Sequence, residues 1–254
     1  MNSLTKSFYL GRIWGIDVFI HSLFFVFFGL LGLMHILSSG ILSAVVFLFF
    51  LTLVFGCVLL HEYGHCLVAK HYKIPVQNIT LTPIGGVASI GAITNPDIEL
   101  KVTIAGPLVN FVIALILLPL AVVSSYVWNN DFCMYLVTVN VILMVFNLIP
   151  AFPMDGGRIL RALLSKKMSL VRATEKAVEV GTWAAIIMAI TGVFVNPMLI
   201  FIAAFVYLAG RAELKMISSQ AYVHFPHDNT RTQHFYAQDQ QELINNLRKI
   251  FYRR

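Results

Sequence analysis

Residues 41–60, ILSAVVFLFFLTLVFGCVLL, contain no charged side chain. About 20 apolar residues in a helix, at 1.5 Å per residue, span the hydrocarbon core of a bilayer. Lipid cannot satisfy unpaired backbone N–H and C=O groups, so a single segment crossing the core must be helical. This run therefore predicts a membrane-crossing α-helix.

Comparable apolar runs recur along the chain, which is 58% hydrophobic and only 12% charged. Soluble domains carry about 25% charged residues, so the composition excludes an ordinary soluble protein. We predict an all-α polytopic membrane protein with about six transmembrane helices. A short membrane-associated β segment is expected near 74–91, where β-branched residues and glycines are typical of short strands. The predicted spans lie near 16–37, 41–69, 102–127, 133–150, 174–195 and 197–214.

The basic residues predict how these spans are oriented. Lysine and arginine in short loops stay on the cytoplasmic side. With the N-terminus inside, six spans place all 18 basic residues on the inner side, and none falls in the predicted outer loops SSG, WNND and VNP. Both termini are therefore predicted to be cytoplasmic. This asymmetry explains the net charge of +6 without a nucleic-acid partner, and the expected surroundings are the lipid bilayer.

The motif HEYGH, residues 61–65, follows the first run directly. On a helix, His61 and His65 share one face, and Glu62 lies beside them, the arrangement of a zinc site with a general base. A charged group near the bilayer centre costs about 2.5–3.5 kcal/mol, which favours a functional role over a structural one. Counting back from Lys70 places the motif roughly 8–14 Å below the inner surface. We expect an active site near the cytoplasmic side.

Asp155, in NLIPAFPMDGGR, is the candidate for a third ligand. Catalytic zinc usually has three protein ligands and one open position, and Asp155 is the other acidic residue predicted at similar depth. Pro150 and Pro153 cannot continue a regular helix, and Gly156 with Gly157 permits close backbone approach. An alternative is that Asp155 caps the helix that follows; the two roles are compatible.

These two segments resemble the site-2 protease family of intramembrane metalloproteases, whose pattern is HExxH followed by NxxPxxPxDG. GPLVN at 106–110 looks like the glycine-proline-asparagine segment of the family, and GGVASIG at 85–91 is similar to its glycine-containing membrane-associated loop. The resemblance covers roughly residues 10–215. It is to the minimal type, without PDZ or CBS domains.

The resemblance implies a zinc metalloendopeptidase with one Zn²⁺ per chain, in which His61, His65 and Asp155 are the ligands and Glu62 is the catalytic base. Asn147 would help to hold the substrate or the developing oxyanion. Family members cleave a transmembrane segment of another protein, usually to release a signalling or transcription factor. We therefore expect a membrane-spanning protein substrate.

The glycine-containing loop is the expected substrate-binding segment, through Gly85, Gly86 and Ser89 together with Asn147. An extended substrate could add to a strand edge there and replace the hydrogen bonds that its helix loses on unwinding. The alternative is that the glycines only form turns.

Two units are expected: a membrane-embedded metalloprotease domain at 1–215 and a cytoplasmic tail at 216–254. The tail segment QELINNLRKIFYRR has apolar residues at helical spacing beside basic ones, which is typical of an amphipathic helix at a membrane surface or against a partner. Control is expected from this tail or from a separate regulatory protein.

Two other functions are considered. A membrane metal transporter also places histidines and carboxylates at membrane depth, but it gives Glu62 no special role and needs polar residues in the outer halves of the spans. A catalytically inactive relative could bind membrane proteins. Replacement of Glu62 by Gln separates both from a protease, which would lose turnover and retain its metal.

Overall fold

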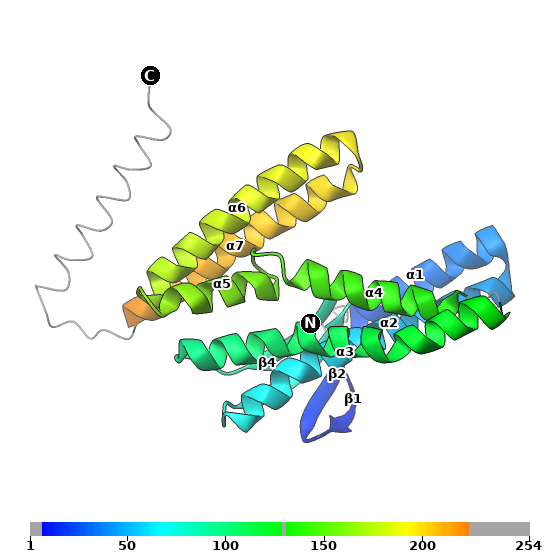
Figure 1. Cartoon of the computed structure of the whole chain (residues 1–254), viewed down its shortest axis with the longest axis horizontal. Coiled ribbons are helices and arrows are strands. Elements are labelled where there is room, and N and C mark those ends of the chain that lie inside the picture. Colours follow the sequence, from blue (N-terminus) through cyan, green and yellow to red (C-terminus); the bar gives the residue numbers. More distant parts are fainter. Residues whose placement is uncertain (1–6, 129–130, 224–254) are drawn as a thin grey trace, which may run out of the picture. The chain divides into compact units, whose positions relative to one another are not determined.

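The computed structural model describes residues 7–128 and 131–223. The chain divides into two compact units, residues 1–214 and 215–254; the predicted amphipathic helix at 241–254 lies outside the described residues. Figure 1 shows the elements in chain order. They are β1 (Ser7–Ile13), β2 (Ile16–His21), α1 (Ser22–Ser39), α2 (Ile41–His71), β3 (Val76–Thr82), β4 (Gly85–Ile90), α3 (Pro96–Trp128), α4 (Phe132–Asn147), α5 (Asp155–Ser165), α6 (Leu170–Phe194) and α7 (Met198–Val223).

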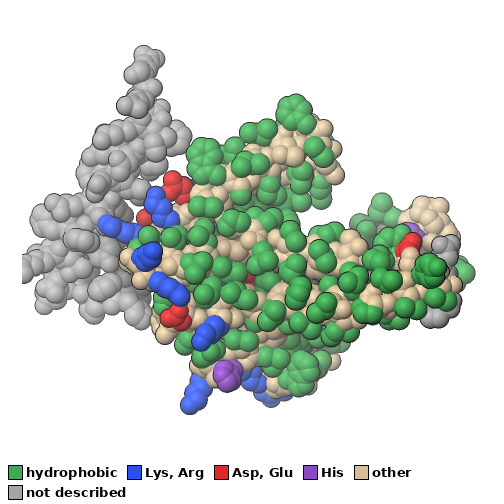
Figure 2. Space-filling view, in the orientation of Figure 1, with side chains coloured by type: hydrophobic (Ala, Val, Ile, Leu, Met, Phe, Trp, Pro, Cys, Tyr) green, Lys and Arg blue, Asp and Glu red, His purple; other side chains and the backbone are tan. Residues whose placement is uncertain are grey.

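The mostly helical membrane fold is confirmed. Among the described helices, α1, α2, α3 and α6 are long and apolar enough to cross a membrane. α4 is apolar but has 16 residues, and α7 carries Arg211, Glu213 and Lys215 in its second half. Figure 2 shows hydrophobic side chains over most of the visible face, with lysine and arginine gathered toward one end. That distribution is typical of a protein whose sides face lipid.

The N-terminal strands correct the all-α prediction and the start of its first span. Residues 16–21 form β2, and the helix begins only at Ser22. Ile16 and Val18 are buried while Asp17 between them is not, a period of two that suits a strand with one packed face. Its apolar residues run on into those of α1, so hydropathy alone joins the two elements.

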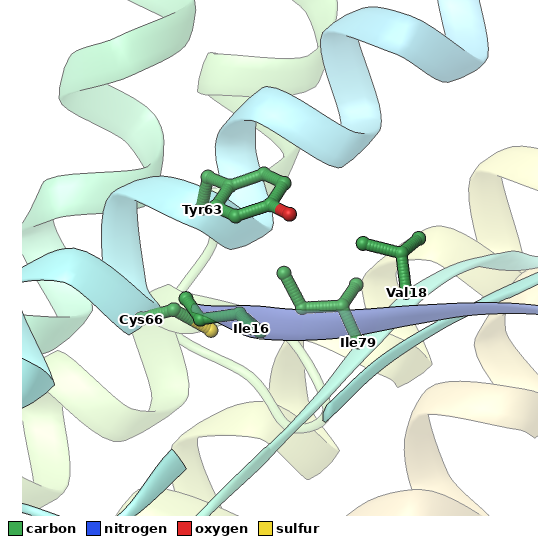
Figure 3. Packing of buried hydrophobic residues seen from close by; sticks show 5 residues of the cluster. All are labelled: Ile16, Val18, Tyr63, Cys66 and Ile79. Carbon is green, nitrogen blue, oxygen red and sulfur yellow. The ribbon is translucent and has the colours of Figure 1, made fainter. Parts of the chain in front are cut away.

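The sheet has the order β1-β2-β3-β4, with antiparallel pairs at both ends and a parallel pair, β2 and β3, in the middle. The expected β segment is present as β3 and β4, within this larger sheet. One face packs against α2 through a cluster that Figure 3 shows in close-up: Ile16, Val18, Ile79, Tyr63 and Cys66.

Tyr63 lies inside the HEYGH motif, and its hydroxyl donates to the carbonyl of Ile13 at 3.3 Å. Its ring also meets the ring of Trp14 edge-on, with the centroids 5.3 Å apart. Lys70, farther along α2, donates to the carbonyl of Trp14 at 2.9 Å. The turn between β1 and β2 is thus attached to the part of α2 that carries the motif.

Candidate metal centre

His61, His65 and Asp155 meet at one buried point. Each offers one ligand atom, and the three atoms lie within 4.8 Å of one another. Nε2 of His61 is 3.1 Å from Oδ2 of Asp155, Nε2 of His65 is 3.2 Å from the same oxygen, and the two Nε2 atoms are 3.1 Å apart. The fold thus brings together two candidate ligands from α2, four positions apart in the sequence, and a third from α5.

The other ring nitrogen of each histidine is already hydrogen-bonded. Nδ1 of His65 donates to the carbonyl oxygen of Val102 at 2.8 Å. Nδ1 of His61 lies 2.5 Å from Oδ1 of Asn110, while Nδ2 of Asn110 donates to Oδ1 of Asn140 at 2.9 Å. Because the Asn110 amide donates to Asn140, its oxygen faces His61 and accepts the Nδ1 proton. Both neutral imidazoles are therefore held with Nε2 as a lone pair.

This donor set fits a divalent metal ion. Two imidazole lone pairs and a carboxylate oxygen converge, an arrangement that is repulsive unless a cation lies between them. Tetrahedral ligands at zinc, with bonds of about 2.0–2.2 Å, are about 3.3–3.6 Å apart, and the observed separations of 3.1–3.2 Å fall a little short of that range. Hydrogen-bonded outer nitrogens are also characteristic of metal-ligating histidines.

Glycines allow α3 to approach the two imidazoles. A Cβ at Gly106 would lie 2.7 Å from Nε2 of His61 and closer still to Nε2 of His65. A Cβ at Gly64, between the histidines on α2, would lie 2.8 Å from the carbonyl oxygen of Ala105. Small residues of this kind let membrane helices pack backbone to backbone. The segment GPLVN therefore forms one wall of the centre.

Asp155 is the first residue of α5, and the residue before it makes no side-chain cap. The Asp155 carboxylate contacts both histidines, so the structure places it with them in the candidate metal centre. Cβ atoms on Gly156 and Gly157 would overlap the backbone of residues 148–152. Only glycine lets the loop fold over the first turn of α5 in this way, which carries the carboxylate inward.

Glu62 lies against β4. A Cβ at Gly86 would come within 2.5 Å of Cγ of Glu62, so the absence of a side chain at 86 makes room for the predicted base. Gly85 begins β4, and the hydroxyl of Ser89 donates to Oδ1 of Asn78 at 3.2 Å. The expected substrate loop therefore includes a strand beside Glu62.

Asn147 is the last residue of α4, and its amide donates to the carbonyl of Leu143 at 2.9 Å. This hydrogen bond lies within its own helix and places Asn147 at the start of the loop that leads to Asp155. Its role in catalysis stays a prediction.

The structure places two polar residues, Asn110 and Asn140, more clearly than sequence patterns do. Asn110, interpreted above only through the segment GPLVN, contacts a histidine of the centre directly. Asn140 was not singled out, yet it is fully buried on α4 and donates to the carbonyl of Leu136 and to Sγ of Cys57. An amide inside the apolar run FCMYLVTVNVILMVF was the available signal, since polar side chains at membrane depth are costly without a partner.

The sequence pattern described as Peptidase family M50 matches residues 49–127 and 127–188. The chain belongs to peptidase family M50. A solved structure entitled Site-2 Protease from Methanocaldococcus jannaschii superposes with a TM-score of 0.61 at 40% identity, covering 82% of this chain and 95% of that one. The resemblance to site-2 proteases is therefore confirmed.

Two curated proteins are similar to this chain. A zinc metalloprotease of Methanocaldococcus jannaschii is 40% identical over 82% of this chain and 60% of its own length. Stage IV sporulation protein FB of Bacillus subtilis is 29% identical over 60% of this chain and 53% of its own length. The chain thus spans between about half and three fifths of the length of these relatives.

Proposed function

We propose that this chain is an intramembrane zinc metalloprotease that hydrolyses a peptide bond within or near the transmembrane segment of another membrane protein. The observation that carries the proposal is the convergence of two imidazole lone pairs and one carboxylate, with separations of 3.1–3.2 Å, beside a glutamate on an apolar helix. Membership of the M50 family supports it. One Zn²⁺ per chain is the expected content, because these residues form a single three-ligand set.

Zinc bound by His61, His65 and Asp155 would polarise the scissile carbonyl and lower the pKa of water to about 7. Glu62 then accepts a proton from the attacking water and returns it to the leaving amine as the C–N bond breaks. Asn110 and the carbonyl of Val102 hold the histidine tautomers through the reaction.

Asn147 is proposed to stabilise the tetrahedral oxyanion. Its Nδ2 carries two hydrogens, and the Leu143 carbonyl accepts one of them; the second can serve a developing negative charge. The position of Asn147 at the start of the loop leading to Asp155 supports this role.

The substrate is proposed to bind in an extended conformation along β4. This strand pairs with β3 and is an edge of the sheet as described, and Gly86 lies against Glu62. A peptide paired with an edge strand regains backbone hydrogen bonds. Gly85, Gly86 and Ser89 would contribute to this site.

Replacing Gly86 with Val tests the proposed strand pairing. The added side chain would collide with Glu62 and obstruct the edge, so cleavage should fall at least tenfold while zinc content is unchanged. Val87→Leu, on an exposed neighbour in the same strand, is the control. Full activity of the Gly86 variant would contradict the role of β4.

The proposed setting is a multi-pass membrane protein with about six spans, in which α4 and α7 join the four helices that are long and apolar enough to cross a membrane. Cytoplasmic termini and a site open toward the cytoplasm follow from the distribution of basic residues. A membrane-tethered signalling or transcription factor is the proposed class of substrate, with a separate protein as regulator.

The decisive experiment compares native protein with Glu62→Gln, both purified, for zinc content and for cleavage of a panel of single-span substrates. We expect about one zinc in both, and loss of about 10²–10⁴-fold in the cleavage rate for the variant. The comparisons favour neither the transporter nor the inactive binder. Zinc flux into vesicles that survives Glu62→Gln, without cleavage by either protein, would support transport instead.

A further inference from the structure

A second buried polar cluster lies where α3, α5 and α7 meet. Arg161 of α5 donates from Nε at 3.0 Å and from Nη2 at 2.5 Å to Oε1 of Glu99, near the start of α3. Its Nη1 donates at 2.5 Å to Oε1 of Glu213 on α7. Arg161 and Glu99 are both buried. One guanidinium therefore connects three helices.

Arg161 also contacts the loop that precedes Asp155. Its guanidinium carbon is 5.3 Å from the centroid of the Phe152 ring. Phe152 is buried and packs with Ala177 and Val178 of α6. Asp155 and Arg161 belong to the same helix of 11 residues, which Figure 1 shows between α3 and the α6–α7 pair. The cluster thus involves the chain on both sides of Asp155, because Phe152 precedes this residue and Arg161 follows it.

The two halves of the metal centre come from different helices. The histidines lie on α2 and are oriented by Asn110 and the Val102 carbonyl of α3, whereas Asp155 arrives on α5. The three ligand atoms keep their separations only if α5 keeps its place against α3. The Arg161–Glu99 pair is a buried polar connection between these two helices.

We propose that Arg161 is a positioning residue that holds the Asp155 carboxylate in register with the two histidines by fixing α5 to α3. This inference rests on the proposed zinc site. It adds a residue outside the ligand set, acting through the helix that carries the third ligand.

The chemistry of the cluster suits positioning better than simple stabilisation. Burial acts to lower the pKa of the Arg161 guanidinium, but the Glu99 and Glu213 carboxylates outweigh it and raise the pKa, so the charge is kept. A buried ion pair is often replaceable by apolar residues without loss of stability. What such residues cannot reproduce is the planar fork of donors, which fixes the direction of approach.

The test measures how fast zinc leaves the purified, zinc-loaded full chain when a strong chelator is added. Arg161→Met should release zinc at least tenfold faster, within the range of about 10–100-fold known for outer-shell changes. Arg161→Lys keeps the charge and loses the fork, so its effect should be intermediate. Lys166→Met is the matched control, because Lys166 pairs with Asp97 at 2.6 Å between the same two helices, with side chains 41% and 66% exposed. It should release zinc at the native rate.

A melting curve of each metal-free variant separates positioning from general stability. A purely structural Arg161 would lower the melting temperature and leave zinc release from the folded protein unchanged, and that result would overturn the proposal.

Should Arg161→Met not fold, Glu213→Gln is the second variant, because it weakens the cluster and leaves the Arg161–Glu99 pair. Glu213→Gln should speed zinc release severalfold, and zinc release at the native rate would count against positioning. Native protein that takes up no zinc would refute the proposed function itself, whereas equal release by native and Arg161→Met would refute only this inference.

Discussion

Two buried polar clusters, each of which joins a residue of α5 to residues of other helices, differ in where their positive charge comes from. Around Arg161, the protein supplies a cation, and two carboxylates accept hydrogen bonds from it. Around His61, two imidazole lone pairs and the Asp155 carboxylate face one another, with the remaining ring protons already donated elsewhere. The first cluster contains its own cation, and we call it the complete cluster; the second contains none, and we call it the incomplete cluster.

The difference indicates which cluster binds a ligand. A buried cluster that contains its own cation and counter-ions can be explained by packing and positioning alone, because its hydrogen bonds offset desolvation. Burying hydrogen-bond acceptors that face no donor costs free energy unless a cation binds between them. We therefore expect the metal ion at the incomplete cluster, and we interpret the complete one as its support.

The largest effect is expected from Gly106→Ala, since the new methyl group would overlap both imidazoles. Zinc affinity should fall by more than ~100-fold, the upper end of the range for substitutions of residues that orient a metal ligand. Competition with a chelator of known affinity measures the loss. Gly56→Ala on α2 is the control, because a Cβ there meets nothing within 4 Å. Normal zinc binding by the Gly106 variant would mean that α3 does not line the centre.

Removing a carboxylate from the complete cluster should destabilise the fold. Glu99→Ala deprives the buried guanidinium of its main acceptor, and loss of one member of a buried pair costs about 3–5 kcal/mol. Unfolding in mixed micelles measures the change. Asp97→Asn, two residues away on an exposed pair, should unfold like the native chain. Equal behaviour of the two variants would show that the Glu99 contact contributes nothing.

Asn110→Ala should weaken zinc binding by about 10–100-fold, the range for a residue that orients a metal-ligating histidine. The His61 imidazole would lose the acceptor that fixes its tautomer. Calorimetric titration of the metal-free protein measures the loss. Asn147→Ala is the comparison, because its amide bonds within its own helix: zinc affinity should be native while turnover falls. An unchanged affinity in Asn110→Ala would remove that residue from the centre.

The sequence predicts the incomplete cluster better than the complete one. HEYGH and the Pro-Asp-Gly loop are local patterns, and polar residues at membrane depth are costly enough to need an explanation. Glu99 lies in the first turn of α3 and Arg161 in a short helix with other basic residues nearby. Charges in such segments are ordinarily solvated, so nothing local distinguishes the two from Asp97. Their burial depends on which helices are neighbours, and periodicity does not report that.

The same limit explains the error at residues 16–21. Hydropathy joins IDVFIH to the helix that follows, and only its pairing with β1 and β3 shows that it is a strand. Gly106 is a comparable case: it reads as an ordinary small residue for helix packing, and its value lies in the two imidazoles placed against it.

The smallest effects should follow the hydrogen-bond chain away from the metal. Asn140 accepts a hydrogen bond from Asn110 and so acts on His61 only through Asn110. Because a neutral hydrogen bond is worth about 0.5–1.5 kcal/mol, Asn140→Ala should weaken zinc binding severalfold. Cys57 meets Asn140 through sulfur, a weak acceptor, so Cys57→Ala should stay within about twofold. The same titration measures both. A larger loss of zinc affinity in Cys57→Ala than in Asn140→Ala would reverse the expected order. The effect of these residues would then come from packing among α2, α3 and α4, and not from orientation of the His61 imidazole.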